Sequence, residues 1–146
     1  DEFFVDMMTT AAQPYEVLAE VRVPVQQAGQ GGAYEKFPQP ASRFAIAGVA
    51  ALVTVQGGVI TAAGIALTGA PTKATRLTAV EQAITGKGAD AIATAAEQAA
   101  NGWDANDDLH ASAEYRRHLA TVLTKRALTR AVAVATGQGQ PRFGLW

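Results

Sequence analysis

Two apolar segments separated by a pair of glycines, residues 44–55 and 59–68, restrict the folds open to this chain. Both segments are rich in Val, Ile, Ala and Thr, and of these the β-branched Val, Ile and Thr favour strands. Gly57 and Gly58 between them can adopt the positive φ angles that a two-residue hairpin turn requires. The pattern predicts an antiparallel β-hairpin, and hence a fold that contains a sheet.

Strand patterns also precede this hairpin. Residues 16–24 alternate with period two, which predicts a strand. One side of that segment is formed by Val17, Ala19, Val21 and Val23. Residues 25–32 have no periodicity and are rich in glycine, so a flexible connection is expected there. Residues 33–37 are expected to form a short strand, since the prolines that follow cannot donate ladder hydrogen bonds.

From Thr75 onward the apolar period becomes helical. In the first helical segment, Thr78 and Glu81 have the spacing of a capping box, and Gly86 fits a C-terminal stop. Its apolar face is formed by Leu77, Val80 and Ile84. Residues 90–100 are rich in alanine and predict a second helix, which can pack closely on a neighbour.

Residues 112–135 predict the longest helix of the chain. Its apolar stripe is formed by Leu119, Val122, Leu123, Ala127 and Ala131. The basic residues Arg116, Lys125 and Arg126 are expected to lie off this stripe. Strands followed by helices predict an α+β fold, in which a small antiparallel sheet of about three to four strands is covered by about three helices.

Composition narrows the functional classes. The chain has 146 residues, which suits one domain, and its 12 basic and 13 acidic residues create no field that would attract nucleic acid or an anionic membrane. It has no cysteine, so disulfides, thiolate metal sites and iron–sulfur ligation are excluded within it. Its longest apolar run is about 12 residues where a spanning helix needs about 20. We expect a cytoplasmic protein, and a start without Met suggests a piece of a longer polypeptide.

The polar residues give no complete active site. Three acidic residues precede the long helix: Asp104, Asp107 and Asp108. They lack the spacing of a calcium loop and suit the positive end of a helix dipole. His110 and His118 are too far apart for a metal pair on one helical turn, and neither serine has the context of an activated nucleophile. We expect no catalytic residue and no metal site here.

Several segments, taken together and in order, resemble one family. They are Asp1 to Val5, the strand pattern 16–24, Ala-Tyr-Glu-Lys-Phe at 33–37, Pro-Ala-Ser-Arg-Phe-Ala at 40–45, residues 49–53, and the string Asp-Asp-Leu-His-Ala-Ser-Ala-Glu-Tyr-Arg-Arg-His-Leu at 107–119. On these residues the chain resembles the C-terminal part of the FAD-binding medium subunits of molybdenum hydroxylases, of the aerobic carbon monoxide dehydrogenase type. The resemblance covers roughly residues 1–130.

The resemblance implies a division of the chain and a set of partners. Residues 1–32 would be the end of the FAD-binding domain plus a linker, 33–136 the flavoprotein C-terminal domain, and 137–146 a tail. FAD in the complete subunit would carry electrons from iron–sulfur clusters to an external acceptor. The partners would be a small subunit with 2Fe-2S clusters and a large subunit with molybdopterin. The chain itself lacks the family's phosphate loops, so we expect it to be inactive and not to retain FAD when isolated.

The resemblance also implies two cofactor contacts, Leu18 and Lys36. Leu18 is placed by the strand pattern Leu-x-Glu-Val-x-Val-Pro, whereas placing Lys36 needs a gap that leaves Glu35 as a competitor. Arg43 departs from the family, which commonly has Asp after the Ala-Ser pair. Two alternatives remain: a subunit-interaction domain with no direct cofactor contact, and a separate small-molecule binding domain.

Overall fold

The computed structural model describes residues 2–139, and its centre is a four-stranded antiparallel sheet. The strands lie in the order β3 (Gln30–Pro38), β4 (Ala45–Gln56), β5 (Val59–Thr68) and β6 (Thr75–Arg76). A separate two-stranded sheet near the N-terminus joins β1 (Phe4–Asp6) to β2 (Thr9–Thr10). Most of the predicted tail, residues 140–146, lies outside the described residues.

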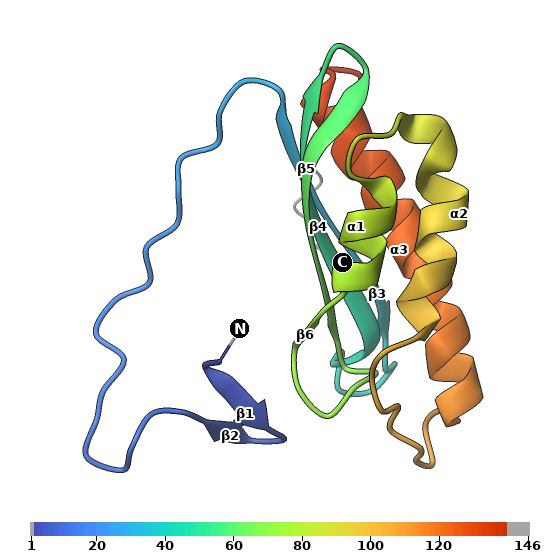
Figure 1. Ribbon diagram of the computed structural model, residues 1–146. Helices are drawn as coiled ribbons and strands as arrows, with labels where there is room; N and C mark the ends of the chain where they lie inside the picture. Colours follow the sequence, from blue (N-terminus) through green and yellow to red (C-terminus); the bar gives the residue numbers. More distant parts are fainter. Residues whose placement is uncertain (1, 140–146) are drawn as a thin grey trace.

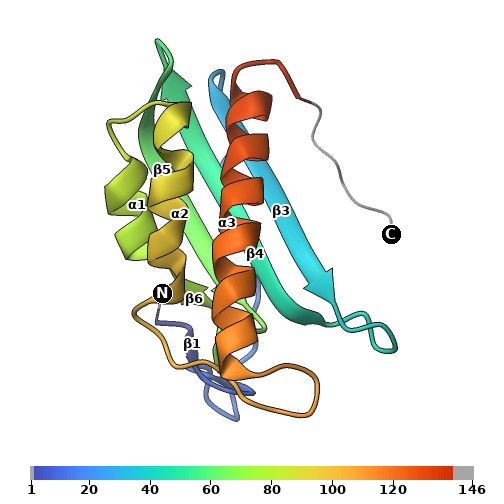
Figure 2. The same ribbon diagram turned by 90° about the vertical axis from the view of Figure 1, so that its right-hand side faces the viewer.

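The helices cover one face of the larger sheet (Figure 1). They are α1 (Thr78–Ile84), α2 (Ile92–Ala96) and α3 (Ala113–Ala135), and α2 is flanked by the short 3-10 turns Ala89–Ala91 and Glu97–Ala100. Turned by 90°, the structure shows α3 running along β3 and β4 (Figure 2), and α3 packs chiefly on these two strands. The predicted α+β fold is therefore confirmed, as are the hairpin and the three helical segments.

The central hairpin turns at the two glycines, as predicted. Gly57 and Gly58 have φ angles of 56° and 80°, and Gln56 pairs with Val59 across the turn. Both angles lie in the left-handed region that glycine adopts without steric cost. The turn sets the pairing next to it, and the register shifts between Thr54, which pairs with Ala62, and Val55, which pairs with Ile60.

The core lies between the helices and the sheet. Alternate residues of β4 and β5 are buried against the helices, among them Val49, Val53, Ile65 and Leu67. Leu123 of α3 is 3% exposed, so the predicted apolar stripe is confirmed at its centre. Val122, at the margin of that stripe, is only half-buried.

The end of the predicted flexible connection, residues 30–32, belongs instead to a strand. Gly29 makes a turn with a φ angle of 78°, and β3 already begins at Gln30. A Cβ atom on Gly31 would clash with the backbone of Ala131 and Ala135 in α3. Gly31 therefore allows the strand to approach the helix closely. Composition alone cannot distinguish a glycine with this packing role from a glycine in a flexible segment.

The strand predicted over residues 16–24 is not formed. The segment is extended but exposed: Val17, Val21 and Val23 are 88%, 73% and 80% exposed. In the described residues no neighbouring strand is hydrogen-bonded to it. The alternating pattern shows only that the segment has two distinct faces. A strand also needs a neighbouring strand that pairs with its N–H and C=O groups, and the pattern does not reveal whether one is present.

The predicted capping box of α1 is also wrong. Leu77, and not Thr78, occupies the N-cap position, and no side chain caps the helix there. The Glu81 carboxylate instead accepts hydrogen bonds from the amide of Ile65 and from Nε of Arg76, each at 2.8 Å. The hydrogen bond between Arg76 and Glu81, together with the negative charge of Glu81, raises the pKa of Arg76. Glu81 therefore ties α1 to the edge of the sheet.

Candidate functional site

The sheet has one face that the helices leave uncovered, which we call the open face (Figure 1). Cross-strand neighbours form a row across it: Tyr34, Ala50, Ala66 and Arg76. A second row contains Gly32, Leu52 and Gly64. Ala50, Leu52 and Ala66 are exposed, whereas the residues next to them in the sequence are buried. The middle of the open face is apolar and has low relief, because most of its side chains are small.

Tyr34 lies over Gly48 on the open face. A Cβ atom added to Gly48 would clash with the hydroxyl oxygen of Tyr34. Tyr34 is 43% exposed, and its partial burial raises the pKa of the phenol. The missing side chain at Gly48 therefore lets the phenol cross β4 at close range.

Lys36 and Glu35 point to opposite sides of β3. Lys36 pairs with Gly48, and its Nζ donates a hydrogen bond to the carbonyl oxygen of Arg43 at 3.1 Å. Glu35 forms an ion pair with Arg130 of α3, and its side chain is 15% exposed. Glu35 thus faces the helical layer, whereas Lys36 lies on the side of the open face.

Leu18 and Lys36 do not line a common cavity. The Leu18 side chain is 62% exposed, and it lines a small cavity of about 410 Å³ together with Phe3, Ala12 and Val17. Lys36 does not line this cavity. The two predicted cofactor contacts therefore do not meet in this cavity.

A larger cavity of about 760 Å³ separates the N-terminal hairpin from the open face. Phe3 and Phe4 form one wall, and small residues of β4 and β5 form the other, with Lys73 and Arg76 at its side. Nζ of Lys73 donates a hydrogen bond to the carbonyl oxygen of Val5 at 3.1 Å, which links the hairpin to the rest of the domain. No sequence pattern predicts this cavity, because it depends on how the N-terminal hairpin and the sheet meet.

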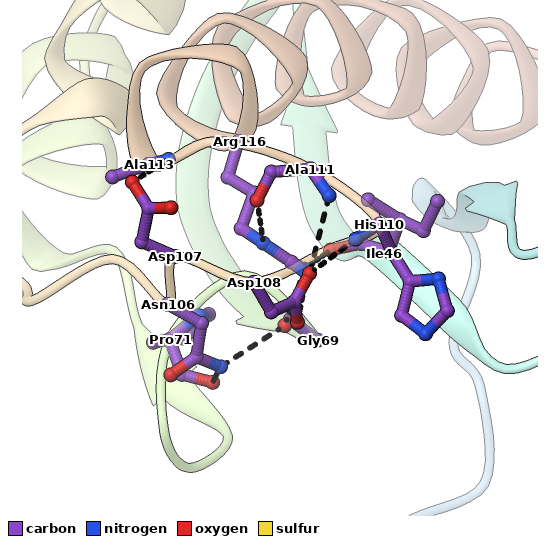
Figure 3. Close-up of polar contacts among 10 residues, drawn as sticks. All are labelled: Ile46, Gly69, Pro71, Asn106, Asp107, Asp108, His110, Ala111, Ala113 and Arg116. Carbon is purple, nitrogen blue, oxygen red and sulfur yellow. Dashed lines mark hydrogen bonds and ion pairs between the residues drawn. The ribbon is translucent and has the colours of Figure 1, made fainter.

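Arg116 is buried, in contrast to its expected position off the apolar stripe. It is 3% exposed, and its Nη1 donates to the carbonyl oxygens of Ile46 at 2.6 Å and Gly69 at 3.1 Å (Figure 3). Its Nη2 pairs with the Asp108 carboxylate at 2.7 Å. A planar guanidinium with several donors suits this convergence of acceptors. Arg116 therefore joins the loop before α3 to β4 and to the end of β5.

Of the three acidic residues predicted to serve the start of the long helix, Asp107 and Asp108 accept hydrogen bonds from backbone amides at or just before α3. Asp107 accepts a hydrogen bond from the amide of Ala113, the first residue of α3, at 3.2 Å. Asp108 accepts from the amides of His110 and Ala111 (Figure 3). The His110 amide, helped by Arg116, lowers the pKa of Asp108. Both carboxylates are thus occupied by backbone donors.

Neither histidine belongs to a polar cluster that suggests catalysis. His110 and His118 are exposed, and the ring of His118 stacks on Tyr115 with centroids 6.3 Å apart. Within residues 2–139, no group of three or more His, Asp or Glu could hold a metal ion. None of the helices in that range is long and apolar enough to cross a membrane.

The described residues offer an exposed apolar surface and one nearby ammonium, and they offer no cradle for a phosphate. The open face offers an apolar surface beside the ammonium of Lys36, and Leu18 offers an exposed apolar side chain. The glycines of residues 25–32 lie in the turn before β3 and in β3, where Gly31 pairs with Val53. Backbone amides in a ladder do not converge on an anion. A flavin held here would need its phosphate groups bound elsewhere.

Comparison with known proteins gives a consistent result. The family model for the CO dehydrogenase flavoprotein C-terminal domain matches residues 32–131. The carbon monoxide dehydrogenase medium chain of Hydrogenophaga pseudoflava is 33% identical over 135 residues, covering 91% of this chain and 47% of that protein. The caffeine dehydrogenase subunit beta of a Pseudomonas species is 32% identical over 133 residues, covering 90% and 45%. The chain spans about half the length of these relatives.

Solved structures show the same likeness. Carbon monoxide dehydrogenase from Hydrogenophaga pseudoflava, in a form that lacks the Mo-pyranopterin moiety, matches with a TM-score of 0.85 at 36% identity, over 90% of this chain and 47% of that one. Quinoline 2-oxidoreductase from Pseudomonas putida 86 matches with a TM-score of 0.81 at 28% identity, over 95% and 48%. The resemblance seen in the sequence segments is confirmed.

Proposed function

Since the chain belongs to the family of CO dehydrogenase flavoprotein C-terminal domains, we propose that it is the C-terminal part of a flavoprotein medium subunit in a molybdenum hydroxylase, where it helps to hold FAD. When bound, FAD would accept electrons from iron–sulfur clusters and pass them to an external acceptor. The protein would position and tune the cofactor, which carries the chemistry. The proposed partners are a small iron–sulfur subunit and a large molybdopterin subunit, in the cytoplasm.

The observation that carries this proposal is the pair of uncovered apolar surfaces in a chain of this family. The open face exposes Leu52 by 53%, and the segment 16–24 exposes its valines almost fully. Contiguous exposed apolar surface marks an interface or a ligand site. We propose that residues 1–32 belong to a preceding FAD-binding domain, 33–136 to the C-terminal domain and 137–146 to a tail.

Within the proposal, Leu18 and Lys36 are the residues of this chain at the cofactor site. Leu18 would contribute an apolar contact from the extended segment. Lys36 would contribute positive charge from the open face, where it can favour negative charge on the cofactor. Glu35 is the weaker candidate, because its carboxylate is already paired with Arg130 on the helical side.

The test uses the complete subunit. Lys36→Ala should weaken FAD binding by about tenfold, because a hydrogen bond or close approach to a charged group contributes about 1.5 kcal/mol or more, and should shift the flavin potential downward. Lys87→Ala, at an exposed lysine outside the proposed site, is the matched control for loss of one positive charge. Unchanged FAD content and potential in both Lys36→Ala and Leu18→Ala would contradict the proposal.

A subunit-interaction domain without cofactor contact is the second candidate, and the exposed apolar surface favours it as well. It predicts that Leu52→Glu, on the open face, reduces assembly of the complex or of the subunit, while Lys36→Ala leaves FAD unaffected. Measuring FAD content and assembly on the same variants therefore separates the two functions.

A further inference from the structure

The loop between β3 and β4 holds an arginine in a backbone conformation that arginine disfavours. Arg43 has a φ angle of +63°, and Met8 is the other residue among 2–139 that is not glycine and has a positive φ. This left-handed region is readily adopted by glycine and, among other residues, chiefly by Asn and Asp. A residue such as Arg persists there only when its surroundings hold it.

The surroundings of Arg43 supply that restraint. Within the loop, the Gln39 side-chain oxygen accepts from the amide and hydroxyl of Ser42 at 2.5 and 3.0 Å, and the Arg43 amide donates to the Gln39 carbonyl at 2.9 Å. From outside the loop, Nζ of Lys36 donates to the carbonyl oxygen of Arg43 at 3.1 Å. The hydrogen bond from Lys36 is the one of these that links Arg43 to the regular part of β3.

The loop presents its side chains outward. Phe44, which follows Arg43, is 80% exposed, and Arg43 itself is exposed. Large side chains on a loop that a rigid strand restrains are typical of surfaces that meet a ligand or a neighbouring domain. A lysine whose ammonium donates to a backbone carbonyl can affect such a surface without touching the ligand.

We propose that Lys36 is a positioning residue, which holds Arg43 in the left-handed conformation and so fixes the loop 39–44 beside the cofactor site. Its contribution to FAD retention passes through this loop. This inference rests on the proposed function, and it replaces the direct charge contact of Lys36 given above by an effect through the loop. The loop mechanism and direct cofactor contact make different predictions. If Lys36 acts through the loop, a residue at position 43 that readily adopts the left-handed conformation should make Lys36 dispensable for FAD retention.

The experiment compares two substitutions at position 43 in the complete subunit that carries Lys36→Met. Arg43→Asn and Arg43→Gln both replace the guanidinium by a neutral amide, but Asn adopts the left-handed region more readily. The readouts are hydrogen exchange of the amides in residues 39–44 and FAD bound per subunit. Lys36→Met alone should speed exchange at least about tenfold and lower FAD content. Adding Arg43→Asn should restore both, and adding Arg43→Gln should restore neither.

Each other result has a distinct meaning. If Lys36→Met does not change loop exchange, the inference is overturned. If Arg43→Asn restores slow exchange but not FAD, Lys36 acts on the cofactor directly, so the inference fails while the proposed function stands. If the loop loosens but FAD content is unchanged, the assignment of Lys36 and its loop to the cofactor is overturned, although the bracing of Arg43 by Lys36 stands.

Discussion

Replacing Arg116 by Met should destabilise the domain more than any change to a surface charge. The substitution keeps an apolar stem but removes the donors that reach Ile46 and Gly69 and the partner of Asp108. Leaving a buried acceptor without its donor costs about 1–3 kcal/mol, and Arg116→Met removes the donor from two carbonyl oxygens. The Asp108 side chain is 43% exposed, so solvent screens that ion pair and most of the cost comes from the carbonyl acceptors. We expect a loss of about 2–6 kcal/mol in the free energy of unfolding.

Urea denaturation with an unchanged m value measures this loss as a lower midpoint. Arg116→Lys should lower the free energy of unfolding by less than Arg116→Met, because an ammonium keeps the positive charge. It should still lower it, because an ammonium lacks the planar fork of donors. Asp108→Asn is the matched control, and its effect should be clearly smaller because the Ile46 and Gly69 contacts remain. A loss below about 1 kcal/mol for Arg116→Met would refute this reasoning. An equal loss for Asp108→Asn would show that the ion pair, and not the carbonyl contacts, dominates.

Three further predictions concern stability and cofactor binding. Leu123→Ala should lower the free energy of unfolding by about 2–5 kcal/mol, since the side chain is 3% exposed, and a loss below about 1 kcal/mol would contradict the packing of α3. The pKa of Asp108 is lowered from its ordinary value of 3.8, so the ionised carboxylate stabilises the fold fully above that pH. This stabilisation is lost as the pH falls through the lower pKa of the folded state. Asp108→Asn should therefore reduce the slope of the free energy of unfolding against pH in that acidic range. The purified chain should fold without FAD, and stoichiometric flavin absorbance would show that it holds the phosphates after all.

The parts of the fold that depend on local chemistry could be predicted from the sequence. Gly57 and Gly58 supply a turn that few other residues can form, and Ser112 caps α3 by accepting from the amide of Tyr115 at 3.2 Å. Arg116 was misplaced because periodicity treats every charge as outward-facing. Its acceptor Ile46 lies 70 residues away, and only the folded chain brings the two together.

The candidate site was less predictable for the same reason. Leu18 and Lys36 came from resemblance to a family, and their contact with FAD stays a prediction. The hydrogen bond of Lys36 depends on the φ angle of Arg43, which a residue name does not reveal. Glu81 shows the converse case: its spacing from Thr78 predicted a local cap, but Ile65 and Arg76 were better partners in the folded chain.

The unpaired segment 16–24 carries a risk of self-association. Its exposed valines alternate along an extended backbone that can pair with any available edge, including the same segment of a second molecule. Glu20 and Arg22 interrupt the opposite side with charge and bond to each other at 2.5 Å, and Pro14 and Pro24 limit the length that can pair. We expect concentrated samples of the separate chain to form β-rich aggregates, and Val21→Lys to delay them without changing the stability of the helical layer.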